Sequence, residues 1–185
     1  CRSPMKLPVK IVEKPWGRIG IDPAFGADPD RRIGEIWFLD PDGDAAALMI
    51  KFLFTSERLS IQVHPDNAQA RARGMTRGKD ECWLVLDAED DAEIALGLRA
   101  QCSIADARGA ALDGSIETMV DWRAAAKGDF IYNPAGTVHA IGAGLIVLEV
   151  QQNVDCTYRL YDYGRPRELH LDDGAQARGR GEAHA

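Results

Sequence analysis

The stretch that decides the fold lies in the second half of the chain and reads Gly128-Asp129-Phe130-Ile131-Tyr132-Asn133-Pro134-Ala135-Gly136-Thr137-Val138-His139. Two short apolar runs flank its Pro-x-Gly pair. Proline fixes its own φ angle and glycine tolerates a positive one, so this pair predicts a tight turn between two strands. The turn would place His139 at the start of the second strand, on the inward face.

Similar runs of four to eight residues recur on both sides of this turn. They are rich in β-branched and aromatic residues and are bounded by Gly, Pro, Asp and Asn, which is typical of strands in an all-β domain. We expect nine strands, which predict a sandwich or barrel: Glu35–Leu39, Ala47–Phe54, Leu59–His64, Glu81–Ala88, Ala92–Leu98, Asp129–Tyr132, Val138–Ile141, Leu145–Gln151 and Tyr158–Asp162.

Two or three short helices interrupt the predicted strands. Asp66–Arg73 begins with an aspartate cap and is followed by Gly74, and Thr118–Lys127 is followed by Gly128. Both patterns carry the usual start and stop signals of a helix. Ser103–Leu112 is the third candidate.

The domain boundaries follow from composition. Residues 6–171 are expected to form a single domain, and residues 172–185 to form a flexible tail, because the tail holds almost no large apolar side chain. Met5 resembles a natural start, so residues 1–4 are left out of the fold prediction.

Length and charge exclude several classes of protein. The 185 residues are 45% hydrophobic and suffice for one compact core that needs neither a disulfide nor a metal for stability. No apolar run approaches the roughly 20 residues of a membrane span. A net charge of −7 with scattered basic residues argues against nucleic acid as a partner, although a few local cations can still hold an anionic substrate. The four cysteines lack metal-binding or CxxC spacing, which favours a reduced, cytoplasmic protein.

Strand alternation groups the candidate site residues. Ser60, Gln62 and His64 share one face of their strand, which is either an inward polar stripe or an ordinary solvated face. Lys79 and Glu81 share a face near the start of the next strand. Gln62, His64, Glu81 and His139 together offer one amide oxygen, two imidazoles and one carboxylate, a set of donors that suits Zn²⁺. With a single negative charge among its ligands, such an ion keeps a local charge of about +1 and acts as a strong Lewis acid.

The order of these motifs resembles a known family. The G-x5-P-x-G-x2-H spacing of residues 128–139 is similar to the second motif of the cupin superfamily, whereas Gln62-Val63-His64 replaces the usual H-x-H of the first. Over roughly residues 6 to 171 the chain resembles type I mannose-6-phosphate isomerases. The segments that carry this resemblance are Glu13-Lys14-Pro15-Trp16-Gly17, Gly34-Glu35-Ile36-Trp37, Lys51-Phe52-Leu53-Phe54, Leu59-Ser60-Ile61-Gln62-Val63-His64-Pro65-Asp66, Gly78-Lys79-Asp80-Glu81-Cys82-Trp83, Pro134-Ala135-Gly136-Thr137-Val138-His139-Ala140-Ile141, Glu149-Val150-Gln151-Gln152-Asn153 and Thr157-Tyr158-Arg159-Leu160-Tyr161-Asp162.

The resemblance implies an all-β, cupin-type jelly-roll barrel in a short, single-domain form. It also implies one Zn²⁺ per chain on Gln62, His64, Glu81 and His139, with Lys79 and Arg159 as catalytic and substrate-binding residues. Ser60 is expected to bind a sugar hydroxyl or to orient a metal ligand. The phosphosugar is the expected partner, and the chain is expected to be a monomer or a homodimer.

The implied reaction interconverts mannose 6-phosphate and fructose 6-phosphate through an enediol. A base must reach the proton on C1 or C2. A zinc-bound water, a lysine of lowered pKa and a carboxylate such as Asp155 all stay open for that role. The phosphate is expected on Arg159 or Arg165 beside Lys79, because a guanidinium offers a bidentate fork. His170 and His184 are expected to be solvated.

Three other functions compete with this one. The first is a metal-containing cupin that binds a sugar phosphate without catalysis, and the second is a cupin isomerase for another sugar phosphate. The third, an iron-dependent oxygenase, is disfavoured because its usual site holds two histidines and one carboxylate.

Overall fold

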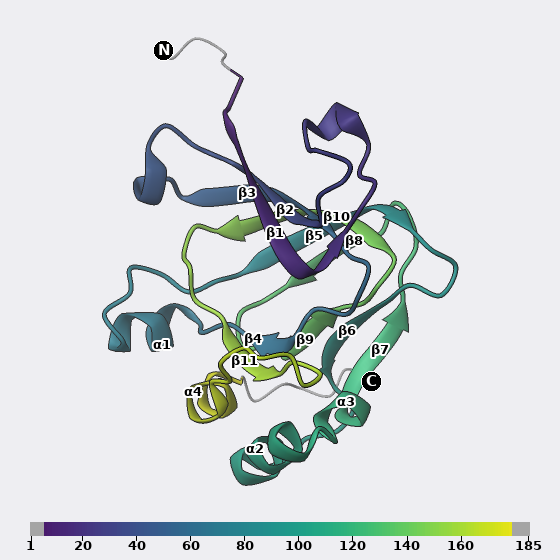
Figure 1. Cartoon of the computed structure of the whole chain (residues 1–185). Helices are drawn as coiled ribbons and strands as arrows, with labels where there is room; N and C mark the ends of the chain where they lie inside the picture. Colours follow the sequence, from purple (N-terminus) through teal and green to yellow (C-terminus); the bar gives the residue numbers. More distant parts are fainter. Residues whose placement is uncertain (1–5, 179–185) are drawn as a thin grey trace.

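The computed structural model of the protein describes residues 6–178, apart from the side chain of Asp44, and consists of two antiparallel sheets packed face to face (Figure 1). The six-stranded sheet runs in the order β1 (Val9–Arg18), β2 (Ile33–Phe38), β3 (Leu48–Phe54), β10 (Leu145–Gln152), β5 (Glu81–Ala88), β8 (Phe130–Asn133). The five-stranded sheet runs in the order β11 (Tyr158–Tyr161), β4 (Ile61–Val63), β9 (His139–Ile141), β6 (Glu93–Leu98), β7 (Val120–Ala124). The predicted all-β class is confirmed.

The main core lies between the two sheets. Trp83, Val85 and Val147 from the larger sheet meet Ile94 and Ile141 from the smaller one, and all five side chains are buried. Burial of each such side chain stabilises the fold by roughly 1.5–3 kcal/mol. One end of the space between the sheets stays open as the cavity described below.

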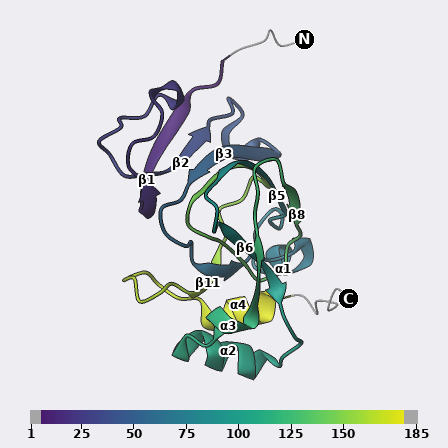
Figure 2. The same cartoon turned by 90° about the vertical axis from the view of Figure 1, so that its right-hand side faces the viewer.

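Short helices cover the outer face of the five-stranded sheet (Figure 2). They are α2 (Ile104–Asp113), α3 (Ile116–Met119) and α4 (Leu171–Ala177), while α1 (Asn67–Ala72) follows β4 and two 3-10 turns span Pro23–Phe25 and Gly43–Ala45. Ile61 and Val63 of β4 point outward into this helical layer and are fully buried by it. Because Leu59 precedes the strand, it packs in the core between the sheets instead.

Strand β1 was not among the predicted strands. Pro15 and Gly17 interrupt its sequence and read as strand breakers. An edge strand tolerates proline because one side of it needs no ladder hydrogen bonds. The pairing of β1 with β2 shifts register between Val12 and Arg18, so the strand accommodates both residues in an irregular stretch.

The predicted helix Thr118–Lys127 is wrong. The chain forms the single-turn helix α3 and then strand β7, in which Val120 pairs with Leu98 and Trp122 with Ala95. Val120 is fully buried. Pairing with β6 therefore outweighs local helix preference, which is a weak determinant in short segments.

The predicted flexible tail differs from the structure at its start, where helix α4 forms. Gly174, Ala175 and Ala177 are buried against β11, and a Cβ atom on Gly174 would lie 2.5 Å from Leu160 Cδ2. Small residues let the helix approach the sheet closely, so the segment packs without large apolar side chains. Residues 1–5 and 179–185, with the predictions made for them and for His184, lie outside the described residues.

Three smaller expectations can be compared with the structure. No helix in residues 6–178 is long and apolar enough to cross a membrane. Within the same residues Cys82, Cys102 and Cys156 are free thiols. The described helix α1 carries the expected aspartate cap, since the Asp66 carboxylate accepts from the Gln69 backbone N–H and the Gln69 side chain accepts from that of Asp66.

Candidate metal centre and substrate cavity

A cavity of about 390 Å³ opens between the two sheets. Strand register explains which side chains enter it. On the five-stranded sheet Gln62 pairs with Arg159 on one side and with His139 on the other, so these three side chains form one inward row. On the six-stranded sheet Glu81 pairs with Gln151 and Asn133 and forms the facing row.

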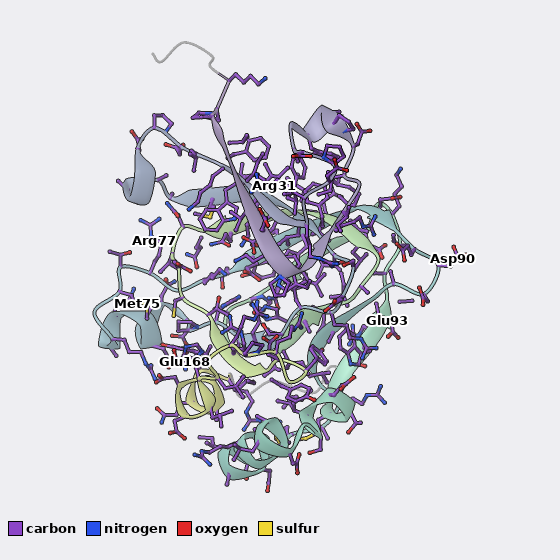
Figure 3. The ribbon with its side chains drawn as sticks, viewed as in Figure 1. Arg31, Met75, Arg77, Asp90, Glu93 and Glu168 are labelled. Carbon is purple, nitrogen blue, oxygen red and sulfur yellow. The ribbon has the colours of Figure 1, made fainter. Side chains whose placement is uncertain are left out.

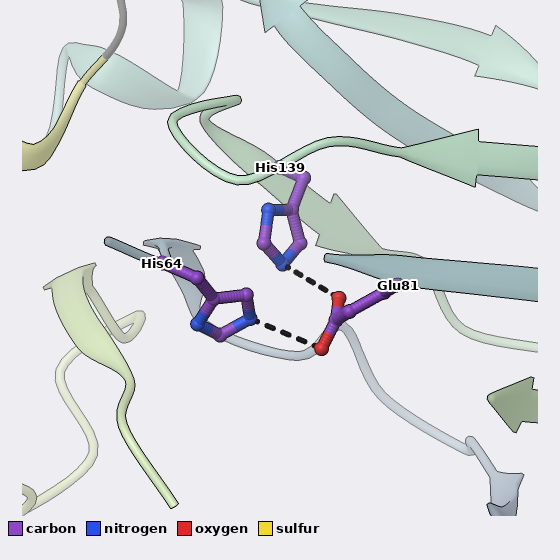
Figure 4. A group of neighbouring side chains, drawn as sticks. All are labelled: His64, Glu81 and His139. Carbon is purple, nitrogen blue, oxygen red and sulfur yellow. Dashed lines mark ion pairs between the residues drawn. The ribbon is translucent and has the colours of Figure 1, made fainter. Parts of the chain in front are cut away.

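Three of the predicted metal ligands meet between these rows (Figure 4). Nε2 of His64 lies 3.1 Å from one carboxylate oxygen of Glu81, and Nε2 of His139 lies 3.5 Å from the other. All three side chains are at most 2% exposed. Residues 64, 81 and 139 therefore converge from the ends of three separate strands.

Backbone carbonyls determine how the two imidazoles are protonated. Nδ1 of His64 lies 2.9 Å from the Cys156 carbonyl oxygen, and Nδ1 of His139 lies 2.9 Å from that of Thr137. A carbonyl only accepts, so each Nδ1 donates and each neutral ring presents a lone pair on Nε2. This is the usual outer-shell arrangement of metal-binding histidines.

The pKa directions agree with neutral rings. Burial, together with the charge of the neighbouring Lys79, lowers the pKa of His64 to about 3. Burial also lowers the pKa of His139, whereas that of the Glu81 carboxyl is held well below its usual range by Lys79 and the two histidines, against the effect of burial. Two imidazole lone pairs thus face an ionised carboxylate, an arrangement of acceptors that a divalent cation fits.

Gln62 and Ser60 border this cluster. The amide nitrogen Nε2 of Gln62 lies 3.3 Å from Nε2 of His139. The Ser60 hydroxyl donates to the amide oxygen Oε1 of Gln62 at 3.0 Å. Both residues line the cavity. The structure thus brings Gln62 within reach of the cluster, with Ser60 positioned to orient its amide.

Lys79 lies beside the cluster, with its Nζ 3.1 Å from a Glu81 oxygen and 3.5 Å from His64 Nε2. Its side chain is buried.

Arg159 also lines the cavity, whereas Arg165 does not. Arg165 faces a separate, smaller hollow with Glu57, Arg58 and Tyr163. His170 is half-buried, and its Nδ1 accepts from the Arg159 backbone N–H, so it is not simply solvated.

The sequence reasoning assigned no role to a second group of charged side chains in the cavity. Lys51 and Glu149 form an ion pair of 2.8 Å, and Glu149 also accepts from the Trp83 indole at 3.1 Å. Lys14 lies 3.6 Å from Glu35. The segments that contain these residues carry the family resemblance. The sequence of one strand, however, does not indicate which residue of a neighbouring strand lies opposite each of its side chains.

The cavity is locally richer in positive charge than the chain as a whole. Five cationic side chains and four acidic ones line it, whereas the whole chain carries a net charge of −7. A pocket with a positive excess raises the local concentration of anions.

Comparisons with known proteins identify relatives of the chain. No protein-family model matches the chain. It is 33% identical over 209 residues to mannose-6-phosphate isomerase of Streptococcus mutans, an alignment that covers 92% of this chain and 66% of that protein. It is 40% identical over 161 residues to mannose-6-phosphate isomerase ManA of Bacillus subtilis, covering 75% and 48%. The chain thus spans from about half to about two thirds of the length of these relatives.

Solved structures give the same result. The crystal structure of a mannose 6-phosphate isomerase from Bacillus subtilis superposes with a TM-score of 0.87 at 32% identity, over 96% of this chain and 69% of that one. A structure from Archaeoglobus fulgidus, at 18% identity and a TM-score of 0.76, supports the fold alone. These matches confirm the predicted cupin-type fold, and the chain belongs to the mannose-6-phosphate isomerase family.

Proposed function

We propose that the chain interconverts mannose 6-phosphate and fructose 6-phosphate with one Zn²⁺ held by Gln62, His64, Glu81 and His139. The observation that carries the proposal is the convergence of two neutral imidazoles and one ionised carboxylate in a cavity lined by cations. The relatives named for this reaction support the choice of substrate.

The donor set fits zinc better than other common cations. Two imidazoles favour Zn²⁺ over Mg²⁺ or Ca²⁺, which prefer oxygen ligands. When bound, the ion supplies a Lewis acid that stabilises negative charge on a sugar oxygen.

The residues of the chain supply the remaining chemistry. Isomerisation moves a proton between C1 and C2 and develops negative charge on the oxygens of an enediol, which nearby cations stabilise. The Lys79 ammonium, fixed 3.1 Å from Glu81, is one such cation, and the Arg159 guanidinium on the five-stranded sheet adds a second positive charge to the cavity. Glu149 and Asp155 are carboxylates of the cavity wall within the same space.

The test is turnover by the purified, zinc-loaded chain. Fructose 6-phosphate should appear from mannose 6-phosphate, and Lys79→Met and Arg159→Met should each lower kcat/KM by about 100-fold or more, since each removes a charge that stabilises the transition state. Lys127→Met and Arg71→Met are matched controls on exposed residues and should retain full activity. Circular dichroism and thermal melting verify that each variant is folded.

Two results would contradict the proposal. One is an absence of turnover under conditions in which a control isomerase is active; thermal stabilisation by mannose 6-phosphate without turnover would then favour a sugar-phosphate-binding protein. The other is iron near one equivalent, with oxygen uptake, in protein purified without chelator.

A further inference from the structure

The cationic side chains of the cavity differ in how many hydrogen-bond donors they keep for a ligand. Each of the three lysines lies beside a glutamate: Lys79 beside Glu81 at 3.1 Å, Lys51 beside Glu149 at 2.8 Å and Lys14 beside Glu35 at 3.6 Å. An ammonium acts as a point charge, whereas a guanidinium that is paired along one edge still presents further N–H donors in a fixed plane. The two arginines of the cavity wall, Arg159 and Arg167, are therefore the cations to consider for the phosphate group.

Arg167 is fixed by a buried carboxylate. Its Nε donates to Asp162 Oδ2 at 2.5 Å and its Nη2 to Asp162 Oδ1 at 2.7 Å, and Asp162 is only 2% exposed. A bidentate fork of this kind sets the plane of the guanidinium. It also leaves Nη1 outside the fork, on a side chain that lines the cavity.

Arg159 has spare donors beside it. Its Nη1 donates to the Glu168 carbonyl at 2.8 Å, but its Nε is buried and has no hydrogen-bond partner within residues 6–178. A buried unpaired donor costs free energy unless a ligand or water satisfies it. The Glu168 carbonyl that Arg159 contacts belongs to the residue next to Arg167, and burial, followed by the charge of Arg167, lowers the pKa of Arg159.

Hydrogen bonds between Arg159 and His170 hold the segment that follows Arg167 against β11. The His170 N–H donates to the Arg159 carbonyl at 2.7 Å, and the Arg159 N–H donates to His170 Nδ1 at 3.2 Å. The segment from Arg167 to His170 thus returns alongside β11. Glu168, labelled in Figure 3, marks this segment above helix α4.

Arg165, which the sequence left open beside Arg159 as a candidate for the phosphate, makes its contacts elsewhere. Its Nη2 donates to the Arg58 carbonyl at 2.6 Å and its Nε to the Asp162 carbonyl at 3.2 Å. These bonds tie the turn at residues 162–167 to Arg58, beside the smaller hollow. Arg165 is therefore a structural neighbour of Asp162 and no part of the cavity wall.

We propose that Arg167, oriented by Asp162, joins Arg159 to bind the phosphate group of the sugar phosphate and sets the preference for phosphorylated over free sugar. The inference rests on the proposed function and adds a substrate-positioning residue to it. Two adjacent guanidiniums with unused donors match a dianionic phosphate in charge and in geometry.

The experiment measures binding without turnover. Sorbitol 6-phosphate has no carbonyl group and cannot be isomerised, so calorimetric titration of the zinc-loaded chain with it reports affinity alone. Arg167→Ala should weaken its binding by about 10- to 100-fold, the usual range for a charge-assisted hydrogen bond. Arg167→Lys should recover only part of this loss, because it restores the charge but not the fork.

Arg165→Ala is the matched control, since it also removes a guanidinium from Asp162. It should change the affinity for sorbitol 6-phosphate by less than about threefold. In turnover assays Arg167→Ala should raise KM for mannose 6-phosphate while kcat stays within about threefold. A purely structural role for Arg167 would not produce this separation of KM from kcat.

The inference is overturned if Arg167→Ala binds sorbitol 6-phosphate within twofold of the unmodified chain, or if Arg165→Ala weakens binding as much as Arg167→Ala does. Its failure is distinct from failure of the proposed function. If the chain has no isomerase activity but Arg167→Ala still weakens its binding of sorbitol 6-phosphate, the phosphate site is supported and the proposed reaction is not. If the chain is active but Arg167→Ala leaves that binding unchanged, the reaction is supported and this phosphate site is not.

Discussion

The ion pair between Lys51 and Glu149 shows how a single residue can affect both the cavity and the stability of the fold. Burial by itself lowers the pKa of Lys51, but Glu149 and Glu35 reverse this and raise it above its usual value. Burial, and then the charge of Glu81, raises the pKa of Glu149. The pair therefore holds two charges in a place where neither is stable alone.

Lys51→Met should lower the free energy of unfolding by about 3–5 kcal/mol, because it leaves the Glu149 carboxylate buried without its partner. The double variant Lys51→Met with Glu149→Leu should recover most of that loss, since no buried charge remains. Urea denaturation of both variants measures the difference. Arg31→Met is the matched control: Arg31 pairs with Glu13 on the surface, where both side chains are more than half exposed, and its loss should cost below about 1 kcal/mol. A single variant as stable as the unmodified chain would contradict this account.

At the same scale, sequence patterns pointed to Gln62, His64, Glu81 and His139, and the structure clusters the last three, with Gln62 beside His139. Alternation along two strands and one Pro-x-Gly turn determine where these side chains point. Lys51 is different, because its partner Glu149 lies in a strand nearly one hundred residues later. Only the register between β3 and β10 brings the two together, and no local pattern encodes that register.

At the scale of elements, the junction between β4 and β5 depends on one glycine. Gly78 packs against the chain that follows His64: a Cβ atom there would lie 2.6 Å from the Pro65 carbonyl oxygen and 2.7 Å from the Asn67 nitrogen. The Gly78 N–H donates to the Asn67 side chain and the Lys79 N–H to the Pro65 carbonyl. Close contact here therefore sets the position of Lys79 relative to His64.

Gly78→Ala should lower the free energy of unfolding by about 1–3 kcal/mol, because backbone atoms must move to admit the methyl group. Gly109→Ala is the matched control within helix α2, where nothing lies within 4 Å of the added Cβ atom. It should stabilise the chain by roughly 0.5–1 kcal/mol through helix propensity. Chemical denaturation measures the free energy of unfolding of both variants. Equal effects of the two substitutions on it would refute the packing argument.

Helices and strands could be predicted from the sequence where a local signal, such as a helix cap, favours the same structure as the tertiary contacts. Helix α1 has a capping box at Asp66, and α2 has one at Ser103, so both were found from sequence. Strand β7 and helix α4 were not, because their formation depends on β6 and on Leu160 of β11. Neither partner can be identified within a short window of sequence.

At the scale of the whole molecule, the proposed metal ligands connect the two sheets. Glu81 begins β5 of the six-stranded sheet, whereas Gln62 lies in β4 and His139 begins β9 of the five-stranded sheet. The core contacts on either side are apolar and do not depend on the ion. We therefore expect the metal-free chain to stay folded but to lose the part of its stability that the ligand cluster contributes.

Removing the metal with a chelator should lower Tm by about 10 °C. An ion present at 1,000 times its Kd stabilises the folded state by about 4 kcal/mol, and each kcal/mol corresponds to about 2–4 °C in a domain of this size. His139→Gln removes one proposed ligand, so its Tm should hardly respond to the chelator, whereas the distant control Lys127→Met should respond as the unmodified chain does. Calorimetric melting with and without chelator measures both. Identical melting of the unmodified chain in the two conditions would mean that no ion joins the sheets, because a bound cation must shift the equilibrium toward the state that binds it.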